Sequence, residues 1–200
     1  LAHCIHLTGD NIRLLAEKRA TAGLVYNPIS NLKLADGVAP VPDLLAAGCT
    51  VGLGTDSNLS NNGLELFNEM RIGSYVQKTF RKDATLMPCQ TMLRMATRGS
   101  AAALKLDREI GSLEPGKKAD VIAVSFERPH LWPVYYENPS NLVEQLVYSA
   151  RASDVVTTVC DGRVLMDGGV VRTVDEAAVF RLVQSCATGL YRRSFPARDA

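Results

Sequence analysis

The sequence predicts an α/β fold built on a parallel sheet, followed by a smaller antiparallel β unit. Residues 51–54 are a short apolar run between polar neighbours, which is typical of a strand buried on both faces. Strand-like and helix-like segments alternate through residues 1–104, the order expected of a parallel sheet covered by helices. Beyond residue 113 short strands and turns follow, including Asp161-Gly162, a strong hairpin signal.

The apolar periodicity places the elements of the first half. Strands are expected at residues 1–6, 24–26 and 50–54. Helices are expected at residues 10–20, 41–47, 64–80 and 88–104. Residues 28–40 and 57–63 are rich in turn-forming residues and are expected to be loops. Because three parallel strands leave unpaired edges, the pattern also predicts further strands before Leu1.

The second half is expected to hold short strands, one inner helix and one terminal helix. The strands are predicted at residues 119–126, 155–160, 163–166 and 170–171, and the inner helix at 141–150. The last helix is expected to begin after Asp175, as its N-cap, and to run to about Arg192.

Composition argues against several classes of protein. The chain has 200 residues, of which 46% are hydrophobic and 22% charged, with a net charge of +1, so no basic surface for nucleic acid is indicated. No apolar run approaches the length of a membrane span. The five cysteines lie far apart without a CxxC pair, which indicates neither a disulfide framework nor a zinc knuckle. We therefore expect a cytoplasmic protein.

Two polar residues at the ends of predicted strands are candidate site residues. Asp56 follows the apolar run 51–54, and ligands of parallel α/β folds bind at the carboxyl ends of strands. A carboxylate there is a candidate metal ligand or proton carrier. His3 lies in an apolar stretch, where an imidazole is either a hydrogen-bonded core group or a catalytic group.

Other polar residues allow two interpretations each. Ser30 and Asn31 could make loop hydrogen bonds or line a pocket, and His6 could lie at a pocket rim or in solvent. Ser60, Asn61 and Asn62 are expected to brace the loop after Asp56, with Asn61 or Asn62 capping the following helix. Glu65 and Glu69, four residues apart, are either solvated charges or a support for the loop after Asp56.

Several motifs, in order, resemble one family. They are His3-Cys4-Ile5-His6, Asn27-Pro28-Ile29-Ser30-Asn31, Gly54-Thr55-Asp56 with Ser60-Asn61-Asn62, Phe67-Asn68-Glu69-Met70-Arg71, Met95-Ala96-Thr97-Arg98-Gly99-Ser100, and Gly111-Ser112-Leu113-Glu114-Pro115-Gly116-Lys117-Lys118-Ala119-Asp120. Together they resemble the amidohydrolase superfamily, in particular its 5-methylthioadenosine/S-adenosylhomocysteine deaminases and related chlorohydrolases.

This resemblance implies the C-terminal part of a (β/α)8 barrel, about strands six to eight, plus part of a small β-sandwich. Residues 1–112 would belong to the barrel, 113–172 to the sandwich, and 173–200 would form a C-terminal helix. The implied activity is metal-dependent deamination of an adenosine-type purine. Two alternatives stay open: an inactive fragment or remnant, and an amidohydrolase acting on another amino-substituted ring, triazine-like or guanine-like.

The resemblance also implies residue roles and partners. His3 matches a histidine beside the attacking water, and Asp56 matches an aspartate that binds the metal and carries a proton. Asp56 and the loop residue Asn31 are also expected to contact the substrate. One divalent metal is implied, zinc first, with iron or manganese as alternatives. A small-molecule substrate and a homo-oligomer of the complete protein are expected, while the charge and the lack of a long apolar run predict neither nucleic acid nor membrane as partner.

The chain also departs from the family pattern. The family's paired histidines after strand one, its strand-five histidine and its ring-protonating glutamate have no counterpart here, so most metal ligands are expected outside this chain. Tyr26 stands where the family commonly has histidine before Asn-Pro.

Overall fold

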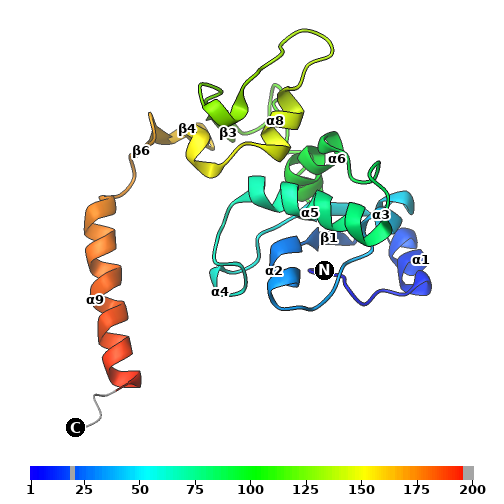
Figure 1. Cartoon of the computed structure of the whole chain (residues 1–200), viewed down its shortest axis with the longest axis horizontal. Coiled ribbons are helices and arrows are strands. Elements are labelled where there is room, and N and C mark those ends of the chain that lie inside the picture. Colours follow the sequence, from blue (N-terminus) through cyan, green and yellow to red (C-terminus); the bar gives the residue numbers. More distant parts are fainter. Residues whose placement is uncertain (19–20, 196–200) are drawn as a thin grey trace.

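The computed structural model of the chain describes residues 1–18 and 21–195. Within those residues the strands form a parallel pair, β1–β2, and an antiparallel sheet in the order β3–β4–β5–β6. Figure 1 shows the first helices gathered around β1, with the last helix, α9, standing away from them at the other side of the molecule.

The parallel pair consists of β1 (Gly23–Tyr26) and β2 (Thr50–Leu53). Leu24 lies opposite Val51 and Tyr26 opposite Leu53. All four of these side chains are buried, as expected for strands with helices around them. The predicted strands at 24–26 and 50–54 are therefore confirmed.

The predicted strand over residues 1–6 is wrong beyond its first residues. Ala2 forms an isolated parallel bridge with Val25, and the His3 amide donates to the Val25 carbonyl at 3.0 Å. His3 and Cys4 then adopt φ angles of 65° and 54°. This left-handed backbone ends the extended segment at the edge of β1.

The predicted helices of the first half are present with shifted ends. They are α1 (Gly9–Glu17), α3 (Val41–Ala46) and α5 (Leu66–Arg81), followed by a continuous helical run of α6 (Cys89–Arg94), a π-helical turn (Met95–Gly99) and α7 (Ser100–Ala103). The prediction extended the first helix to Ala20, which lies outside the described residues. A Cβ on Gly99 would lie 2.6 Å from the Val51 carbonyl oxygen, so glycine lets this run pack directly against β2.

The two predicted loops each contain a short helix. α2 (Pro28–Lys33) begins within residues 28–40 and α4 (Asn58–Asn61) within 57–63, so the loop predictions are wrong for these residues. Proline is favoured in the first turn of a helix, and Ser57 caps α4 by accepting from the Ser60 amide. These helix-start signals outweighed the turn-forming composition.

The core of the first half lies where α5 crosses the end of β1. A Cβ on Gly73 would lie 3.1 Å from both the Tyr26 ring and the Met92 side chain, which shows how closely α5 approaches them. Met70, Met92 and Leu53 are all at most 4% exposed. Burial of such side chains stabilises a fold by about 1.5–3 kcal/mol each.

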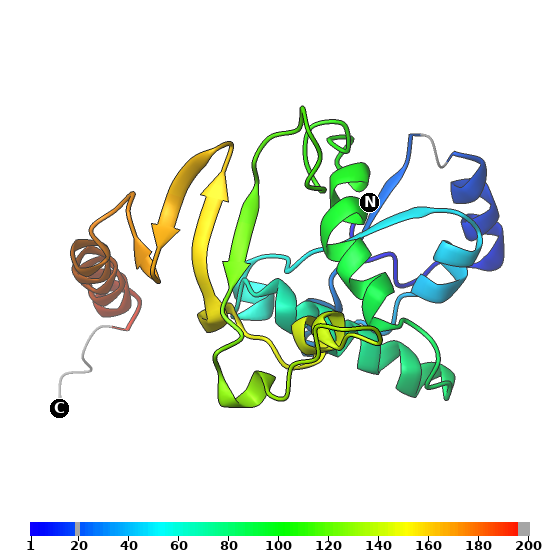
Figure 2. The same cartoon turned by 90° about the horizontal axis from the view of Figure 1, so that it is seen from above.

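The second half is built on the antiparallel sheet, whose strands lie side by side in Figure 2. Its strands are β3 (Val121–Val124), β4 (Val155–Cys160), β5 (Arg163–Asp167) and β6 (Val170–Val171), and its short helices are α8 (Leu142–Tyr148) and two 3-10 turns (Pro129–Leu131 and Ala152–Asp154). Asp161 and Gly162 have φ angles of 49° and 76°, as the predicted tight hairpin turn requires.

The terminal helix α9 (Glu176–Ser194) begins after Asp175, whose side chain accepts from the Ala178 amide, as predicted. None of its residues is buried. In the part of the chain that the structure describes, no helix combines the length and apolar character needed to cross a bilayer.

Candidate functional site

The predicted site residue Asp56 lies just beyond β2 with a φ of 60°. Its Oδ2 accepts hydrogen bonds from two hydroxyls, Ser30 Oγ and Ser60 Oγ, each at 2.6 Å. Ser30 comes from α2 and Ser60 from α4, the two short helices that the turn-rich composition concealed. The carboxylate is therefore held between two elements that follow neighbouring strands.

These hydrogen bonds fix the charge of Asp56. The Ser30 and Ser60 hydroxyls and the Ser57 backbone amide lower the pKa of Asp56 to about 2, with a smaller contribution from the nearby His3. Donors that bind the ionised form favour it over the neutral acid. Asp56 is thus an anion at neutral pH, suited to bind a cation or a hydrogen-bond donor.

His3 lies beside Asp56. Its Nδ1 is 2.7 Å from Asn31 Oδ1, and its Nε2 is 3.9 Å from Asp56 Oδ2. Because a carbonyl oxygen can only accept, Nδ1 carries the proton in this pairing. The other ring nitrogen, Nε2, faces the Asp56 carboxylate, and the His3 side chain is 36% exposed.

Asn31 is buried and turned toward His3. The residue is 1% exposed, and its Nδ2 has no hydrogen-bond partner among the described residues. The structure therefore places Asn31 to orient the imidazole. Its predicted contact with substrate stays a prediction.

The other candidates lie in different surroundings. His6 is exposed. Tyr26 is 2% exposed, and its hydroxyl accepts from Gln77 Nε2 at 3.2 Å. Burial raises the pKa of Tyr26 to about 12, despite this hydrogen bond. Tyr26 is therefore a core residue that stays neutral.

A buried glutamate supports the loop after Asp56. Glu69 is 0% exposed and accepts from the side chain of Asn61 and from the Ile29 amide. Of the two interpretations of Glu69, support of the loop is the one the structure favours. The expectation that Asn61 or Asn62 caps α5 is wrong, because Glu65 occupies the N-cap position and no side chain caps it.

The sequence left two interpretations of Glu69 open, although the helical spacing indicated that its side chain is buried. Glu69 shares a helix face with buried Gly73 and with Gln77, so it lies on the inward stripe of α5. A carboxylate on such a stripe must find donors in the interior.

A metal was predicted at this site, but the described residues of this chain do not supply enough ligands to bind it by themselves. Among residues 1–18 and 21–195, no group of three or more His, Cys, Asp or Glu side chains is arranged to bind a metal ion. Catalytic zinc takes three protein ligands. The described residues offer Asp56, with His3 beside it.

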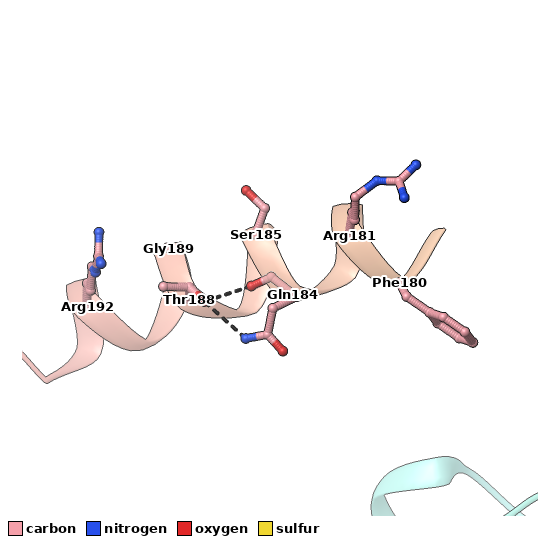
Figure 3. A pocket seen from close by; sticks show the side chains of 7 residues that line it. All are labelled: Phe180, Arg181, Gln184, Ser185, Thr188, Gly189 and Arg192. Atoms are coloured by element: carbon pink, nitrogen blue, oxygen red, sulfur yellow. Dashed lines mark hydrogen bonds between the residues drawn. The ribbon is translucent and has the colours of Figure 1, made fainter. Parts of the chain in front are cut away.

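Two hollows elsewhere do not include these residues. One lies between the first half and β3, and it is largely apolar, with Phe67, Leu93 and Ile122 in its wall. The other runs along α9 (Figure 3) and is formed by that helix alone. Its lining residues are Phe180, Arg181, Gln184, Ser185, Thr188, Gly189 and Arg192.

Comparison with known proteins gives consistent relatives. The chain is 46% identical over 182 residues to a 5-methylthioadenosine/S-adenosylhomocysteine deaminase of Moorella thermoacetica, which covers 91% of this chain and 41% of the relative. The crystal structure of an adenosine deaminase from Xanthomonas campestris with bound zinc matches with a TM-score of 0.86 and 33% identity, over 92% of this chain and 40% of that one. The zinc complex of the atrazine chlorohydrolase TrzN from Arthrobacter aurescens shares the fold, with a TM-score of 0.82 and 24% identity over 92% of this chain and 40% of that one.

The chain thus spans about two fifths of the length of the relatives it matches. The model of the amidohydrolase family matches residues 1–165. The chain belongs to the amidohydrolase family.

Proposed function

We propose that this chain is the C-terminal portion of a metal-dependent aminohydrolase that deaminates an adenosine-type purine, such as S-adenosylhomocysteine or 5-methylthioadenosine. The observation that carries the proposal is the cluster in which His3 and Asp56, on two segments that both pair with β1, lie 3.9 Å apart. The deaminase names of relatives at 46% identity support the substrate class.

The proposal includes the place of the chain in the larger fold. Residues 1–112 would supply about strands six to eight of a (β/α)8 barrel, 113–172 part of the β-sandwich, and 173–200 a C-terminal helix. The change from the parallel pair β1–β2 to the antiparallel sheet β3–β6 supports this division. The complete protein is proposed to be cytoplasmic and homo-oligomeric, with a small-molecule substrate.

Asp56 is proposed to supply one ligand to a divalent metal, zinc first, with the other ligands outside this chain. The zinc in the Xanthomonas campestris structure supports that choice. When bound, such a metal activates water for attack on the ring.

The residues of this chain have separate tasks in that reaction. Asp56, held ionised by Ser30 and Ser60, provides a fixed negative charge at the strand end. His3 is oriented through Nδ1 by Asn31, which leaves Nε2 to exchange a hydrogen bond with the nucleophile or the tetrahedral centre. Asn31 keeps the ring in this orientation.

A chimera tests the proposal. In the Moorella thermoacetica deaminase, the matching segment is replaced by this chain, and ammonia release from S-adenosylhomocysteine, 5-methylthioadenosine, guanine and an aminotriazine is measured. Metal-dependent turnover of the adenosine-type substrates supports the proposal. Preference for guanine or the triazine would select the alternative ring, and a correctly folded but inactive chimera would favour the remnant.

The 200-residue chain alone is the matched control. Because it lacks a complete ligand set among its described residues, it should release only background ammonia with zinc, iron or manganese added. Robust turnover by the chain alone would contradict the proposed division of ligands.

A further inference from the structure

Glu69 is a fully buried carboxylate whose two oxygens both have partners near the site. Oε2 accepts from the Ile29 amide at 3.2 Å, and Oε1 accepts from the side-chain amide of Asn61. Asn61 Nδ2 also donates to the Thr55 carbonyl at 2.6 Å. One side chain of α5 thereby joins α2, α4 and the end of β2.

Each of these contacts lies one residue from a group that forms the site. Ile29 precedes Ser30, Asn61 follows Ser60, and Thr55 precedes Asp56. Ser30 and Ser60 are the two hydroxyls bound to Asp56 Oδ2. Glu69 therefore connects α2 and α4 through residues adjacent to the two serines that bind Asp56.

We propose that Glu69 is a positioning residue, which acts through the Ile29 amide and Asn61 to hold the Ser30 and Ser60 hydroxyls on Asp56. The proposal rests on the proposed function only in so far as Asp56 serves catalysis. Glu69 makes its hydrogen bonds to Ile29 and Asn61 rather than to Asp56 and is 0% exposed, so it is not a catalytic residue.

The carboxylate is the group that this position requires. Both neighbours are N–H donors, so a side chain here must accept twice, once with each oxygen. Glutamine has the same shape but one oxygen, and its amide would face a donor. Glu69→Gln should therefore lose the hydrogen bond from either the Ile29 amide or Asn61, which weakens the attachment of α2 or of α4 to α5.

The variant Glu69→Gln tests this, with Glu65→Gln as the matched control. Glu65 lies one helical turn earlier, and its Oε1 accepts from the Ala152 amide at 2.8 Å, away from Asp56. Both variants remove one negative charge near the start of α5. Hydrogen exchange followed by mass spectrometry on the 200-residue chain should show faster exchange at residues 29–33 and 57–63 in Glu69→Gln only.

A double-mutant cycle in the chimera with the Moorella thermoacetica enzyme tests the functional link. Glu69→Gln should lower kcat about 10- to 100-fold with little change in KM, as loss of an outer support does elsewhere. Glu69→Gln should be combined with Ser30→Ala in one cycle and with Ser60→Ala in another. In each double variant the loss of kcat should be smaller than the product of the two separate losses, because both residues act on Asp56. Glu65→Gln should leave kcat unchanged.

The outcomes separate this inference from the proposed function. Equal exchange in the two variants, or a fully additive cycle, would overturn the positioning role. An inactive chimera would count against the proposed function alone, since the exchange experiment would still decide whether Glu69 holds the two helices.

Discussion

His3 Nε2 lies 3.9 Å from Asp56 Oδ2, although the two residues come from different β/α units. Both have a left-handed backbone, with φ angles of 65° and 60°. Such backbone is costly for residues other than glycine and is found where surrounding contacts enforce it, often at functional sites. Here Asn31 holds His3, while Ser30 and Ser60 hold Asp56.

Replacement of His3 should affect catalysis more than binding. In the chimera, His3→Gln should lower kcat by about 100-fold with KM little changed, because a positioned proton-transfer or hydrogen-bonding group contributes about that much. His6→Gln is the control, since His6 is an exposed neighbour. Steady-state kinetics on both variants decides, and equal effects of the two substitutions would remove His3 from the mechanism.

Stability should depend on a buried acid in the second half of the chain. Asp154 is 1% exposed and accepts from His130 Nε2 at 2.8 Å and from the Arg151 amide at 2.9 Å. Burial alone would raise the pKa of Asp154, but the hydrogen bonds from His130 and Arg151 prevail and lower it. Asp154→Asn should lower the free energy of unfolding at pH 7 by about 3 kcal/mol.

The sign of the pH effect follows from the lowered pKa. The contribution of Asp154 is fully present above its unfolded pKa of about 3.9 and is lost as pH falls through the lower folded pKa. Urea unfolding from pH 7 to pH 3 should show the wild-type advantage over Asp154→Asn shrinking below about pH 4. An advantage that grows in acid would contradict the assignment.

The close packing of α7 against β2 should make an added methyl group at Gly52 destabilising. A Cβ on Gly52 would lie 2.7 Å from the Ser100 Cα, so Gly52→Ala should cost about 1–3 kcal/mol of unfolding free energy. Gly9→Ala, at the start of α1, meets nothing within 4 Å and should be neutral or stabilising. Thermal melting of the two variants compares them directly, and a neutral Gly52→Ala would show that α7 can move away.

The sequence predicted the fold elements best where a local signal marks their ends. The terminal helix after Asp175 and the hairpin at Asp161-Gly162 were predictable because a cap and a tight turn have local chemistry. The strand over residues 1–6 failed because the left-handed backbone at His3 is imposed by contacts with other elements. No local pattern reports such a conformation for a histidine.

The candidate site divides in the same way. Asp56 could be found because it follows an apolar strand segment, and His3 because it is a polar residue inside an apolar stretch. Ser60 and Glu69 depend on how α4 and α5 meet, which periodicity does not determine. For Ser30 the sequence left two interpretations open, because its hydrogen-bond partner, Asp56, is distant in the sequence.

Under the proposed function, Asp56 supplies one metal ligand to the active site of an aminohydrolase. In the chimera with the Moorella thermoacetica deaminase, Asp56→Asn keeps the shape of the side chain and removes its charge. Asp107→Asn, at an exposed aspartate in the loop before β3, is the matched control.

The decisive measurement is ammonia release from S-adenosylhomocysteine, with bound metal quantified on the same samples. We expect Asp56→Asn to lower both turnover and metal content steeply, while Asp107→Asn matches the unmodified chimera, because a carboxylate ligand cannot be replaced by a neutral amide without loss. Turnover and metal content at the unmodified level in Asp56→Asn would contradict the account.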